Sequence, residues 1–281
     1  MSVRPRVGVV GHVEWVDFAV VARVPVAGEI VTATEHFALP AGGGAVAAVQ
    51  LRKLAGAALF LCALGDDELG ERSARELRER HGVELHAVTR AGRAQRRAFT
   101  HLDANAERTI TVLGARLVPH RDDPLPWDEL ARLDGVYFTG GDAAAARAAR
   151  AARVLVASAR AHEALLEANV TPDVLVASTR DEKERAGAAA LRPPPRWLVL
   201  TDGARGGRYE AADGSSGSWP AAELPGPPAD AYGCGDSFAA GLAYGLAAGR
   251  ELAAALALGA RCGAHCLTGR GPFAGQLAGA D

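Results

Sequence analysis

Short apolar runs, separated by longer stretches rich in alanine and arginine, recur along the chain. Such runs are typical of strands that are buried on both faces of a parallel sheet. They comprise Val7–Val10, Ala58–Leu64, Gly135–Thr139, Val154–Ala157, Val174–Ala177 and Trp197–Thr201. Intervening stretches have helical spacing, as at Ala45–Ala55 and at Glu68–Arg80, and Gly82 is the expected C-cap of the latter. This alternation predicts an α/β fold with a doubly wound, mostly parallel sheet flanked by helices.

Two segments in the N-terminal half break this alternation and resemble β-hairpins. In the first, the pattern predicts a strand from Trp15 to Val24, a turn at Pro25–Gly28 and a return strand at Ile30–Phe37. In the second, Ala98–Asp103 and Thr109–Leu113 flank a polar turn. Neither hairpin fits the main sheet. We therefore expect a small accessory sheet on a single domain that spans residues 1–281.

The composition excludes several classes of partner. A chain with 49% hydrophobic and 23% charged residues is typical of globular proteins, and a net charge of −2 offers no basic field for a nucleic-acid backbone. No apolar stretch is long enough to cross a bilayer. Gly11, His12 and Glu14 interrupt the first apolar run, so no signal peptide is expected. The sequence predicts a cytoplasmic protein with a small-molecule partner, and neither nucleic acid nor membrane.

Four scattered cysteines do not form the framework of a disulfide-bonded fold. Cys262, His265 and Cys266 would share one face of a helix, which raises the question of a metal site. A fourth ligand and a loop are not evident. The favoured interpretation is that these are small, buried helix residues.

The segment Asp230–Phe238 combines glycines with a carboxylate just before a long helix of small residues. Gly233 and Gly235 permit a tight turn and a close approach of the backbone to a ligand. The free N–H groups and the positive dipole end of the helix would face this turn, which suits a phosphate group. Asp236 could accept the proton of an attacking hydroxyl, although aspartate also caps helices in this position. The segment thus indicates phosphoryl transfer.

This segment resembles the C-terminal signature of the ribokinase-like (PfkB) carbohydrate kinases, Asp-Thr-x-Gly-Ala-Gly-Asp-x-Phe. The matching residues are Asp230, Gly233, Gly235, Asp236 and Phe238, while Ala231 and Cys234 replace the usual Thr and Ala. The resemblance implies ATP-dependent phosphorylation of a hydroxyl group on a sugar or sugar-like molecule. It implies Asp236 as general base and Gly233, Cys234 and Gly235 as an anion hole. It also implies Mg²⁺ and a monovalent cation such as K⁺ near Asp230.

Other parts of the chain are similar to further motifs of that family. Gly42, Gly43 and Gly44 look like its N-terminal signature, whose backbone approaches the sugar, and Gly65–Gly70 looks like its Gly-x-Asp-x-x-Gly turn. The positions that look like its nucleotide site are Thr201, Gly203 and Gly206, with adenine expected near Ala260 and Gly263. The two hairpins correspond to its lid, at about residues 12–40 and 95–115. An apolar lid face with Trp15, Phe18 and Val20 would predict a homodimer through the lid.

Several positions depart from the family pattern and leave the substrate open. Ala47 stands where a sugar-binding Asn is usual, and Glu14 and Asp17 compete for the role of the sugar-binding acid. The Asn-x-x-Glu motif corresponds to Ser178–Asp181, where Asp181 would serve the metal through water; Glu182 and Glu184 are nearby alternatives. Two alternative functions therefore stand beside the sugar kinase. One is a nucleoside kinase of the same fold, and the other is a nucleotide- or sugar-binding regulator with weakened catalysis.

No other nucleotide motif competes with this interpretation. Gly8–Gly11 lacks the spacing of a Rossmann fingerprint, and neither lysine of the chain follows a glycine-rich P-loop. Arg93, Arg96 and Arg97 precede the second hairpin and could reach an acidic or phosphorylated substrate. Clusters of this kind also occur by default on the surface of an arginine-rich chain, so both interpretations stay open.

Overall fold

The main sheet of the computed structural model, which describes residues 4–280, has nine strands. They are, in spatial order, β13 (Ser216–Trp219), β12 (Gly207–Ala211), β11 (Trp197–Thr201), β10 (Val174–Ser178), β9 (Val154–Ser158), β8 (Gly135–Phe138), β1 (Val7–Val10), β4 (Leu59–Gly65) and β5 (Glu84–Arg90). Neighbouring strands from β11 to β5 run parallel, and only β12 and β13 run antiparallel. The predicted mostly parallel sheet is confirmed.

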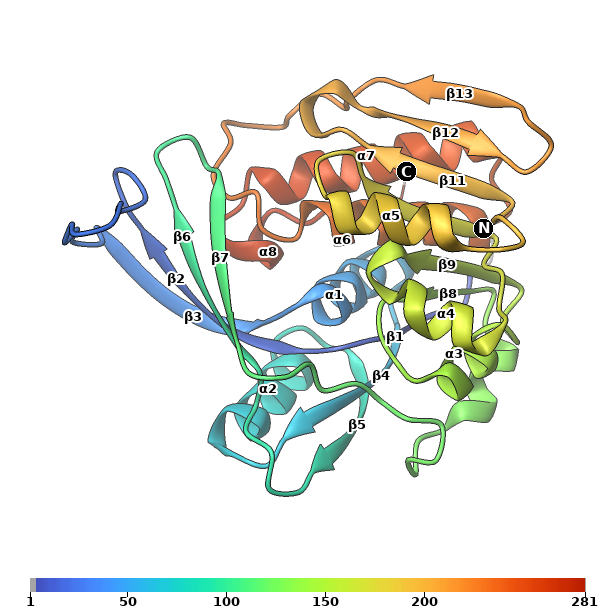
Figure 1. The fold of residues 1–281 in the computed structure, drawn as a ribbon, viewed down its shortest axis with the longest axis horizontal. Helices are drawn as coiled ribbons and strands as arrows, with labels where there is room; N and C mark the ends of the chain where they lie inside the picture. The colour runs from blue at the N-terminus through green and yellow to red at the C-terminus, as the bar shows by residue number, and fades with distance from the viewer. Residues whose placement is uncertain (1–3, 281) are drawn as a thin grey trace.

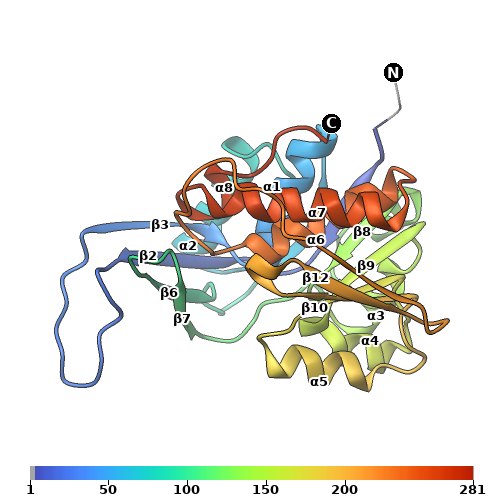
Figure 2. The same cartoon turned by 90° about the horizontal axis from the view of Figure 1, so that it is seen from above.

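Helices cover both faces of this sheet (Figures 1 and 2). The two faces follow from strand alternation, since Val9 packs in one hydrophobic cluster and Val10 in the other. The first cluster lies under α1 (Gly43–Ala55), α6 (Cys234–Ala247), α7 (Leu252–Leu267) and α8 (Gly271–Ala274), and it also holds Leu77 of α2 (Glu68–Glu79). The second lies under α3 (Ala143–Ala149), α4 (His162–Ala168), α5 (Glu182–Ala190) and the 3₁₀ turn η1 (Trp127–Arg132).

A separate four-stranded sheet stands beside the main body (Figure 1). Its strands are β3 (Glu35–Ala41), β2 (Glu14–Val20), β6 (Arg97–Leu102) and β7 (Arg108–Leu113), in that spatial order. The two predicted hairpins meet because β2 and β6 pair in parallel, with Phe18 opposite Thr100. Hereafter we call this sheet the lid sheet.

The boundaries of the first hairpin differ from the prediction. Strand β2 ends at Val20 and β3 begins only at Glu35, so Val21–Thr34 form a loop that projects from the molecule (Figure 2). Pro25 lacks an N–H and Gly28 has a φ of 86°, which interrupts strand pairing there. The ladder instead extends to Pro40 and Ala41, where the chain enters α1.

The apolar residues expected on an exposed lid face are not exposed. Trp15 and Phe18 are buried within the monomer, so this part of the prediction was wrong. The Arg72 guanidinium of α2 covers Trp15 at 4.5 Å from the ring centroid, and Phe18 stacks on Phe37. The exposed apolar side chains of the lid are Val26, Ile30, Ile110, Val112 and Leu113.

Smaller differences concern the ends and edges of the main body. Helix α2 has Arg80 as its C-cap residue, and Gly82 follows two residues later with a φ of 63°. Strands β5, β12 and β13 were not predicted, because their exposed positions dilute the apolar pattern. Cys262 and Cys266 are buried in α7, in agreement with the interpretation as helix core residues. In residues 4–280, no helix combines the length and apolar character needed to cross a membrane.

Strands β1 and β8 mark the point at which the winding of the sheet reverses. They are neighbours, yet the chain continues from β1 toward β4 on one side and from β8 toward β9 on the other. Crevices at the carboxyl ends of strands at such a point are the usual ligand sites of doubly wound sheets. Here that edge carries Gly11 and His12 after β1, and Thr139 and Gly140 after β8.

Candidate active site

The N-terminus of α6 forms an open turn with unpaired backbone donors. Gly233 is its N-cap residue, with φ 81° and ψ 0°, and the helix has no side-chain cap. Within residues 4–280, the N–H groups of Cys234, Gly235 and Asp236 have no hydrogen-bond acceptor, and no atom lies within 4 Å of a methyl group built on Gly235. This arrangement can bind an anion through backbone donors and the helix dipole.

Gly233 is required in this turn for two reasons. Its positive φ disfavours any residue with a side chain, and a methyl group there would lie 2.9 Å from Cβ of Pro272 and 2.9 Å from Cγ1 of Val46. The turn is thus clamped between α1 and the start of α8. Cys234 has a pKa raised by its hydrogen bond with Cys266 and by burial, so its thiol stays protonated.

Asp236 lies partly exposed in the first turn of α6, where its carboxylate meets the end of β8. Tyr137 donates a hydrogen bond to Oδ1 over 3.4 Å. Burial raises the pKa of Asp236, Arg160 and Arg108 oppose this shift, and Glu184 adds to it, so that the pKa is about 6. Such a carboxylate is mostly ionised at neutral pH and basic enough to accept a proton from a hydroxyl in a transition state.

Asp230 fixes the position of the turn at Gly233–Asp236, which is called the catalytic turn below after the role predicted for Asp236. It is almost fully buried, and its two oxygens accept hydrogen bonds from Tyr232 N at 2.8 Å and from Gly271 N at 3.1 Å. Burial raises its pKa to about 6. Both oxygens therefore already join the turn to the start of α8. A monovalent cation at Asp230, as expected from the resemblance, stays a prediction.

The Gly42–Gly44 segment approaches Asp236 directly. A methyl group on Gly43 would lie 2.8 Å from Oδ1 of Asp236 and 3.1 Å from Oγ1 of Thr139, and Gly42 N donates to Tyr232 Oη over 3.3 Å. The absence of side chains thus leaves room for a small molecule next to the carboxylate. Ala47, proposed from the sequence as a substrate position, is instead fully buried in the core. Val46, one residue earlier, faces the catalytic turn.

The structure separates the two acids that competed for the substrate. Side chains alternate along β2, so Glu14 and Phe18 share the face toward the catalytic turn, and Trp15 and Asp17 share the other. Glu14 lies against Gly42. Asp17 pairs with Arg97 at 2.9 Å on the far face, which is a correction to its proposed role.

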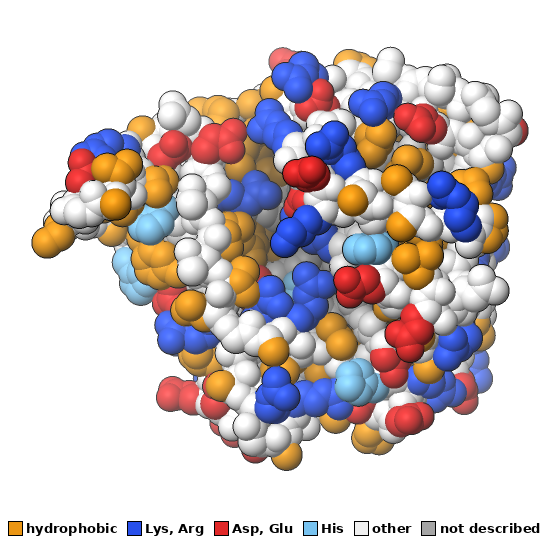
Figure 3. All heavy atoms as spheres, viewed as in Figure 1, with side chains coloured by type: hydrophobic (Ala, Val, Ile, Leu, Met, Phe, Trp, Pro, Cys, Tyr) orange, Lys and Arg blue, Asp and Glu red, His pale blue; other side chains and the backbone are white. Residues whose placement is uncertain are grey.

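Basic side chains gather beside Glu14. Lys and Arg side chains also surround the hollow between the lid sheet and the body (Figure 3). Arg96 Nε lies 2.6 Å from Oε1 of Glu14, and His12 Nε2 lies 3.7 Å from the same oxygen. Arg116, from the loop after β7, approaches Gly140 together with His12. Burial lowers the pKa of His12 well below its usual value, and Arg116, Arg96 and Arg160 lower it further. His12 is therefore neutral at pH 7.

A cluster of ion pairs around Arg160 lies where the sequence places the metal motif. Arg160 Nη2 pairs with Oδ2 of Asp181 at 2.6 Å, and Arg160 Nε pairs with Oε1 of Glu184 at 2.5 Å. Asp181 also caps α5 by accepting from the N–H groups of residues 183 and 184. Glu184 is buried and accepts from Ser178 N at 2.7 Å. The oxygens of both carboxylates thus already have protein partners, and their remaining lone pairs are what they can offer to a metal.

The residues proposed for nucleotide binding lie along one rim of the sheet. Ser178 and Thr201 are opposite each other in β10 and β11, and Gly203 and Gly206 follow with φ values of 56° and 79°. A cavity of about 170 Å³ adjoins this loop, lined by Thr179, Leu200, Asp202, Arg205, Gly207 and Arg208. Ala260 and Gly263 are partly exposed on α7, and a methyl on Gly263 would lie 3.2 Å from Cys234 O.

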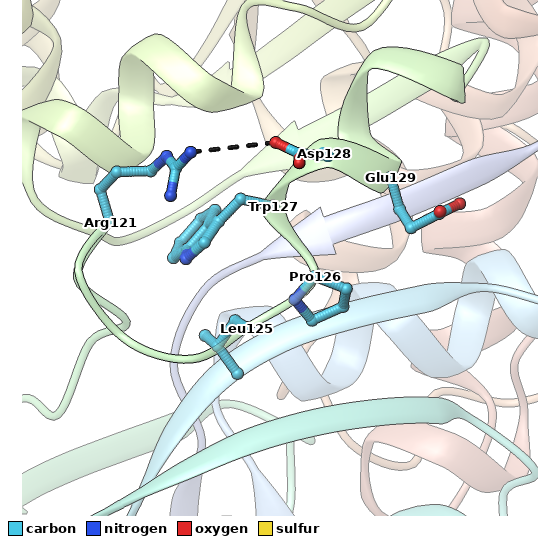
Figure 4. Close-up of a pocket in the computed structure, with 6 residues that line it drawn as sticks. All are labelled: Arg121, Leu125, Pro126, Trp127, Asp128 and Glu129. Carbon is cyan, nitrogen blue, oxygen red and sulfur yellow. Dashed lines mark ion pairs between the residues drawn. The ribbon is translucent and has the colours of Figure 1, made fainter.

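A larger hollow of about 290 Å³ lies elsewhere, around η1 (Figure 4). Its lining residues are Arg121, Leu125, Pro126, Trp127, Asp128 and Glu129. Arg121 and Asp128 form an ion pair at 3.9 Å across Trp127, and Asp128 is fully exposed. The hollow adjoins α3, and none of the site residues proposed from the sequence lines it.

Sequence reasoning missed His12, Arg116, Tyr137 and Arg160. Each comes from a segment with no motif of its own, and only the fold brings them to Asp236. The one available signal was positional, because His12 and Thr139 follow directly after apolar strands. For Arg116 and Arg160, the general abundance of arginine hides any signal.

Comparison with known proteins provides independent evidence about the family of this chain. Residues 4–276 match the family model described as pfkB family carbohydrate kinase. The chain belongs to this family. Its members are kinases, so the protein is a kinase enzyme, as the resemblance in the catalytic turn predicted. No curated protein sequence matches the chain.

Solved structures of this family share the fold. A putative ribokinase from Agrobacterium tumefaciens has a TM-score of 0.82 at 21% identity, with 98% of this chain and 95% of that chain covered. Arabidopsis thaliana ribokinase, solved with ribose and ATP, has a TM-score of 0.75 at 18% identity, with 97% and 96% covered. Adenosine kinase from Sinorhizobium meliloti has a TM-score of 0.73 at 16% identity, with 96% and 95% covered. These similarities confirm the fold class.

Proposed function

We propose that this PfkB-family kinase transfers the γ-phosphoryl group of ATP to a hydroxyl group of a sugar or sugar-like molecule. The observation that carries the proposal is the juxtaposition of unpaired donors at Cys234–Asp236 with a carboxylate whose pKa is raised to about 6. An anion site next to a tuned base is what phosphoryl transfer to a hydroxyl requires. The ribokinase solved with ribose and ATP has the same fold, which supports the choice of donor and acceptor.

In the proposed reaction, the acceptor hydroxyl lies against the Asp236 carboxylate, beside the contact of that carboxylate with Gly43. Its proton passes to the Asp236 carboxylate as its oxygen bonds to the γ-phosphorus, and the bond from that phosphorus to the bridging oxygen of ADP breaks. The N–H groups at the start of α6 stabilise the charge that develops on the phosphoryl oxygens. Tyr137 keeps Asp236 oriented, since its hydroxyl has a pKa raised far above 10 by burial and remains a donor.

The described residues would bind the phosphates of ATP directly, but they would bind Mg²⁺ only through water. Backbone donors at α6 suit the phosphates, and Thr201, Gly203, Gly206, Ala260 and Gly263 would hold the nucleoside along the rim described above. Asp181 and Glu184 would hold Mg²⁺ through water, because Arg160 already occupies one oxygen of each. When bound, Mg²⁺ supplies positive charge at the phosphates. Arg160 adds a fixed positive charge next to it.

The lid sheet would close over the acceptor and exclude water. Arg108 of β7 already donates to Ala231 O over 2.7 Å, which links the lid to the catalytic turn. In addition, a homodimer would cover the loop that projects from the lid, where Val26 and Ile30 are 64% and 99% exposed. Sedimentation of a monomer alone at micromolar concentration would contradict the dimer.

The decisive experiment compares wild type with Asp236→Asn. We would measure ADP release from Mg-ATP against sugars, sugar acids, sugar phosphates and nucleosides. Acceptor-dependent turnover that falls at least about a hundredfold in the variant would support Asp236 as the base. Turnover with purine nucleosides alone would move the acceptor class to nucleosides. Binding of ATP without turnover on any acceptor would contradict the kinase and favour a binding regulator.

A further inference from the structure

Arg116 is a half-buried cation without a carboxylate partner. No Asp or Glu of residues 4–280 lies within ion-pair distance of its guanidinium, whereas Arg96 and Arg160 beside it both have acidic partners. Burial lowers the pKa of Arg116, and the neighbouring Arg96 lowers it further. A desolvated, unpaired arginine is unfavourable in the free protein, so it needs a partner that the chain itself does not provide.

His12 independently points to a ligand at the same place. Its side chain is 5% exposed, and its Nδ1 atom is buried without any hydrogen-bond partner among the described residues. A methyl group built on Gly140 would lie 3.7 Å from this Nδ1 and 3.9 Å from Cδ of Arg116. His12 Nδ1 and the Arg116 side chain therefore flank one spot at Gly140, which Val118 also adjoins, with its Cγ1 atom 3.2 Å from the same methyl position.

This spot lies on the acceptor side of the catalytic base. Asp236 contacts the Gly43 position, Thr139 contacts the same position, and Gly140 follows Thr139 directly. The contacts from the base to Arg116 thus run along the ends of β1 and β8. The proposed nucleotide residues lie along β10, β11 and α7 instead. Arg160 of the proposed metal site is also a neighbour of Arg116, and we assign a group that binds Arg116 while a hydroxyl sits at Asp236 to the acceptor because the printed contacts join Arg116 to the ends of β1 and β8.

We propose that the acceptor is an anionic sugar derivative, whose carboxylate or phosphate monoester binds Arg116 and His12 while its hydroxyl faces Asp236. This rests on the proposed kinase function and specifies its substrate class. The arginine fork matches the planar or tetrahedral oxygens of both groups, and His12 adds one further hydrogen bond. Arg96 adds positive potential from the lid side, and Glu14 remains available for a neutral hydroxyl.

The test uses acceptors with and without an anionic group on the same carbon skeleton. One set is D-ribose, D-ribonate and D-ribose 5-phosphate, and the other is D-glucose, D-gluconate and D-glucose 6-phosphate. The expected result is a kcat/KM for at least one anion that exceeds its neutral counterpart by about a hundredfold, because a site built for a polar group rejects a ligand that lacks it. Which anion leads separates a carboxylate from a phosphate ester.

Arg116→Gln should remove this preference. It should raise the KM of the anionic acceptor by about a hundredfold, with the KM of ATP changed less than about threefold. Because Arg116 has no ion pair to lose, the melting temperature should not fall. Arg97→Gln is the matched control, since Arg97 lies on the far face of the lid sheet with Asp17 and should leave the acceptor preference unchanged.

Three results would overturn the proposal, and a lack of turnover alone would affect only the kinase function. The proposal of an anion-binding site at Arg116 is contradicted if a neutral sugar or nucleoside is the best acceptor. It is also contradicted if Arg116→Gln keeps the preference for an anionic acceptor. If no compound is phosphorylated, thermal stabilisation by D-ribonate or D-ribose 5-phosphate is measured instead. Stabilisation of wild type but not of Arg116→Gln still supports the anion-binding site, and stabilisation of neither overturns it.

Discussion

The ionisation of a single carboxylate sets the expected pH dependence of this enzyme. Burial raises the pKa of Asp236 to about 6, and only the ionised form can accept a proton. We therefore expect kcat/KM to rise with pH through about 6 and to level off above it. Steady-state rates between pH 5 and 8 check this. A profile that is flat across that window, with binding of ATP unchanged, would contradict Asp236 as the base.

The same carboxylate should reduce stability where it is active. A folded-state pKa above the unfolded value means that the folded protein holds its proton more tightly, so stability is lost as pH rises from about 4 to about 6. Asp236→Asn should therefore melt at a higher temperature than wild type at pH 8, and the two should converge as pH falls to about 4. Thermal melts at both pH values measure this. Equal melting temperatures at pH 8 would argue against the raised pKa.

At the residue level, the sequence predicted the parts of the site that are contiguous and missed those that are not. Gly233, Gly235 and Asp236 follow one another within a helix start, so turn chemistry and the helix dipole could be inferred locally. Arg116 and His12 are separated by a hundred residues of chain and meet only through the order of the strands. The choice between Glu14 and Asp17 needed the strand register, because adjacent positions point to opposite faces.

Within one element, the start of α6 depends on the room that Gly233 leaves. Gly233→Ala adds a methyl group that meets Pro272 and Val46 at a positive φ, so it should destabilise the protein by about 2–4 kcal/mol and abolish turnover. Denaturant unfolding and ADP release measure both effects.

Gly249→Ala is the matched control at the other end of α6. Gly249 also has a positive φ, 77°, but no atom lies within 4 Å of a methyl group there. Gly249→Ala should lower the free energy of unfolding only through backbone strain, by about 1 kcal/mol, and should leave turnover unchanged. If both substitutions had the same effect on stability, the packing of Gly233 against α1 would not matter.

Elements were predicted best where burial is uniform. The central strands β1, β4, β8, β9, β10 and β11 are buried on both faces and gave continuous apolar runs, so they were found within about one residue. Strands β12 and β13, at one end of the sheet, carry polar residues and glycine at exposed positions, so neither periodicity nor apolar content marks them. In the lid, the projecting loop has apolar residues that imitate strands, which explains the misplaced first hairpin.

At the scale of the whole molecule, the open hollow between lid sheet and body predicts closure on ligand binding (Figure 3). All six residues of β7 are exposed in this structure. With a phosphorylatable acceptor and the analogue AMP-PNP, amide hydrogen exchange in β7 should slow by at least about tenfold. The internal control is β13, an edge strand of the main sheet, in which the rate of amide hydrogen exchange should not change. Unaltered exchange in β7 with both ligands bound would exclude closure.

Strand β7 forms the outer edge of the lid sheet, and within residues 4–280 no other strand pairs with it there. Its backbone therefore offers a row of vacant hydrogen-bonding groups beside Ile110, Val112 and Leu113, all partly exposed. Such an edge is a template for extended segments of other chains and thus a starting point for aggregation. This edge is exposed in the open, substrate-free state, so the enzyme is more prone to aggregate when substrate is scarce. Saturation with substrate should therefore also prolong its shelf life in concentrated solution.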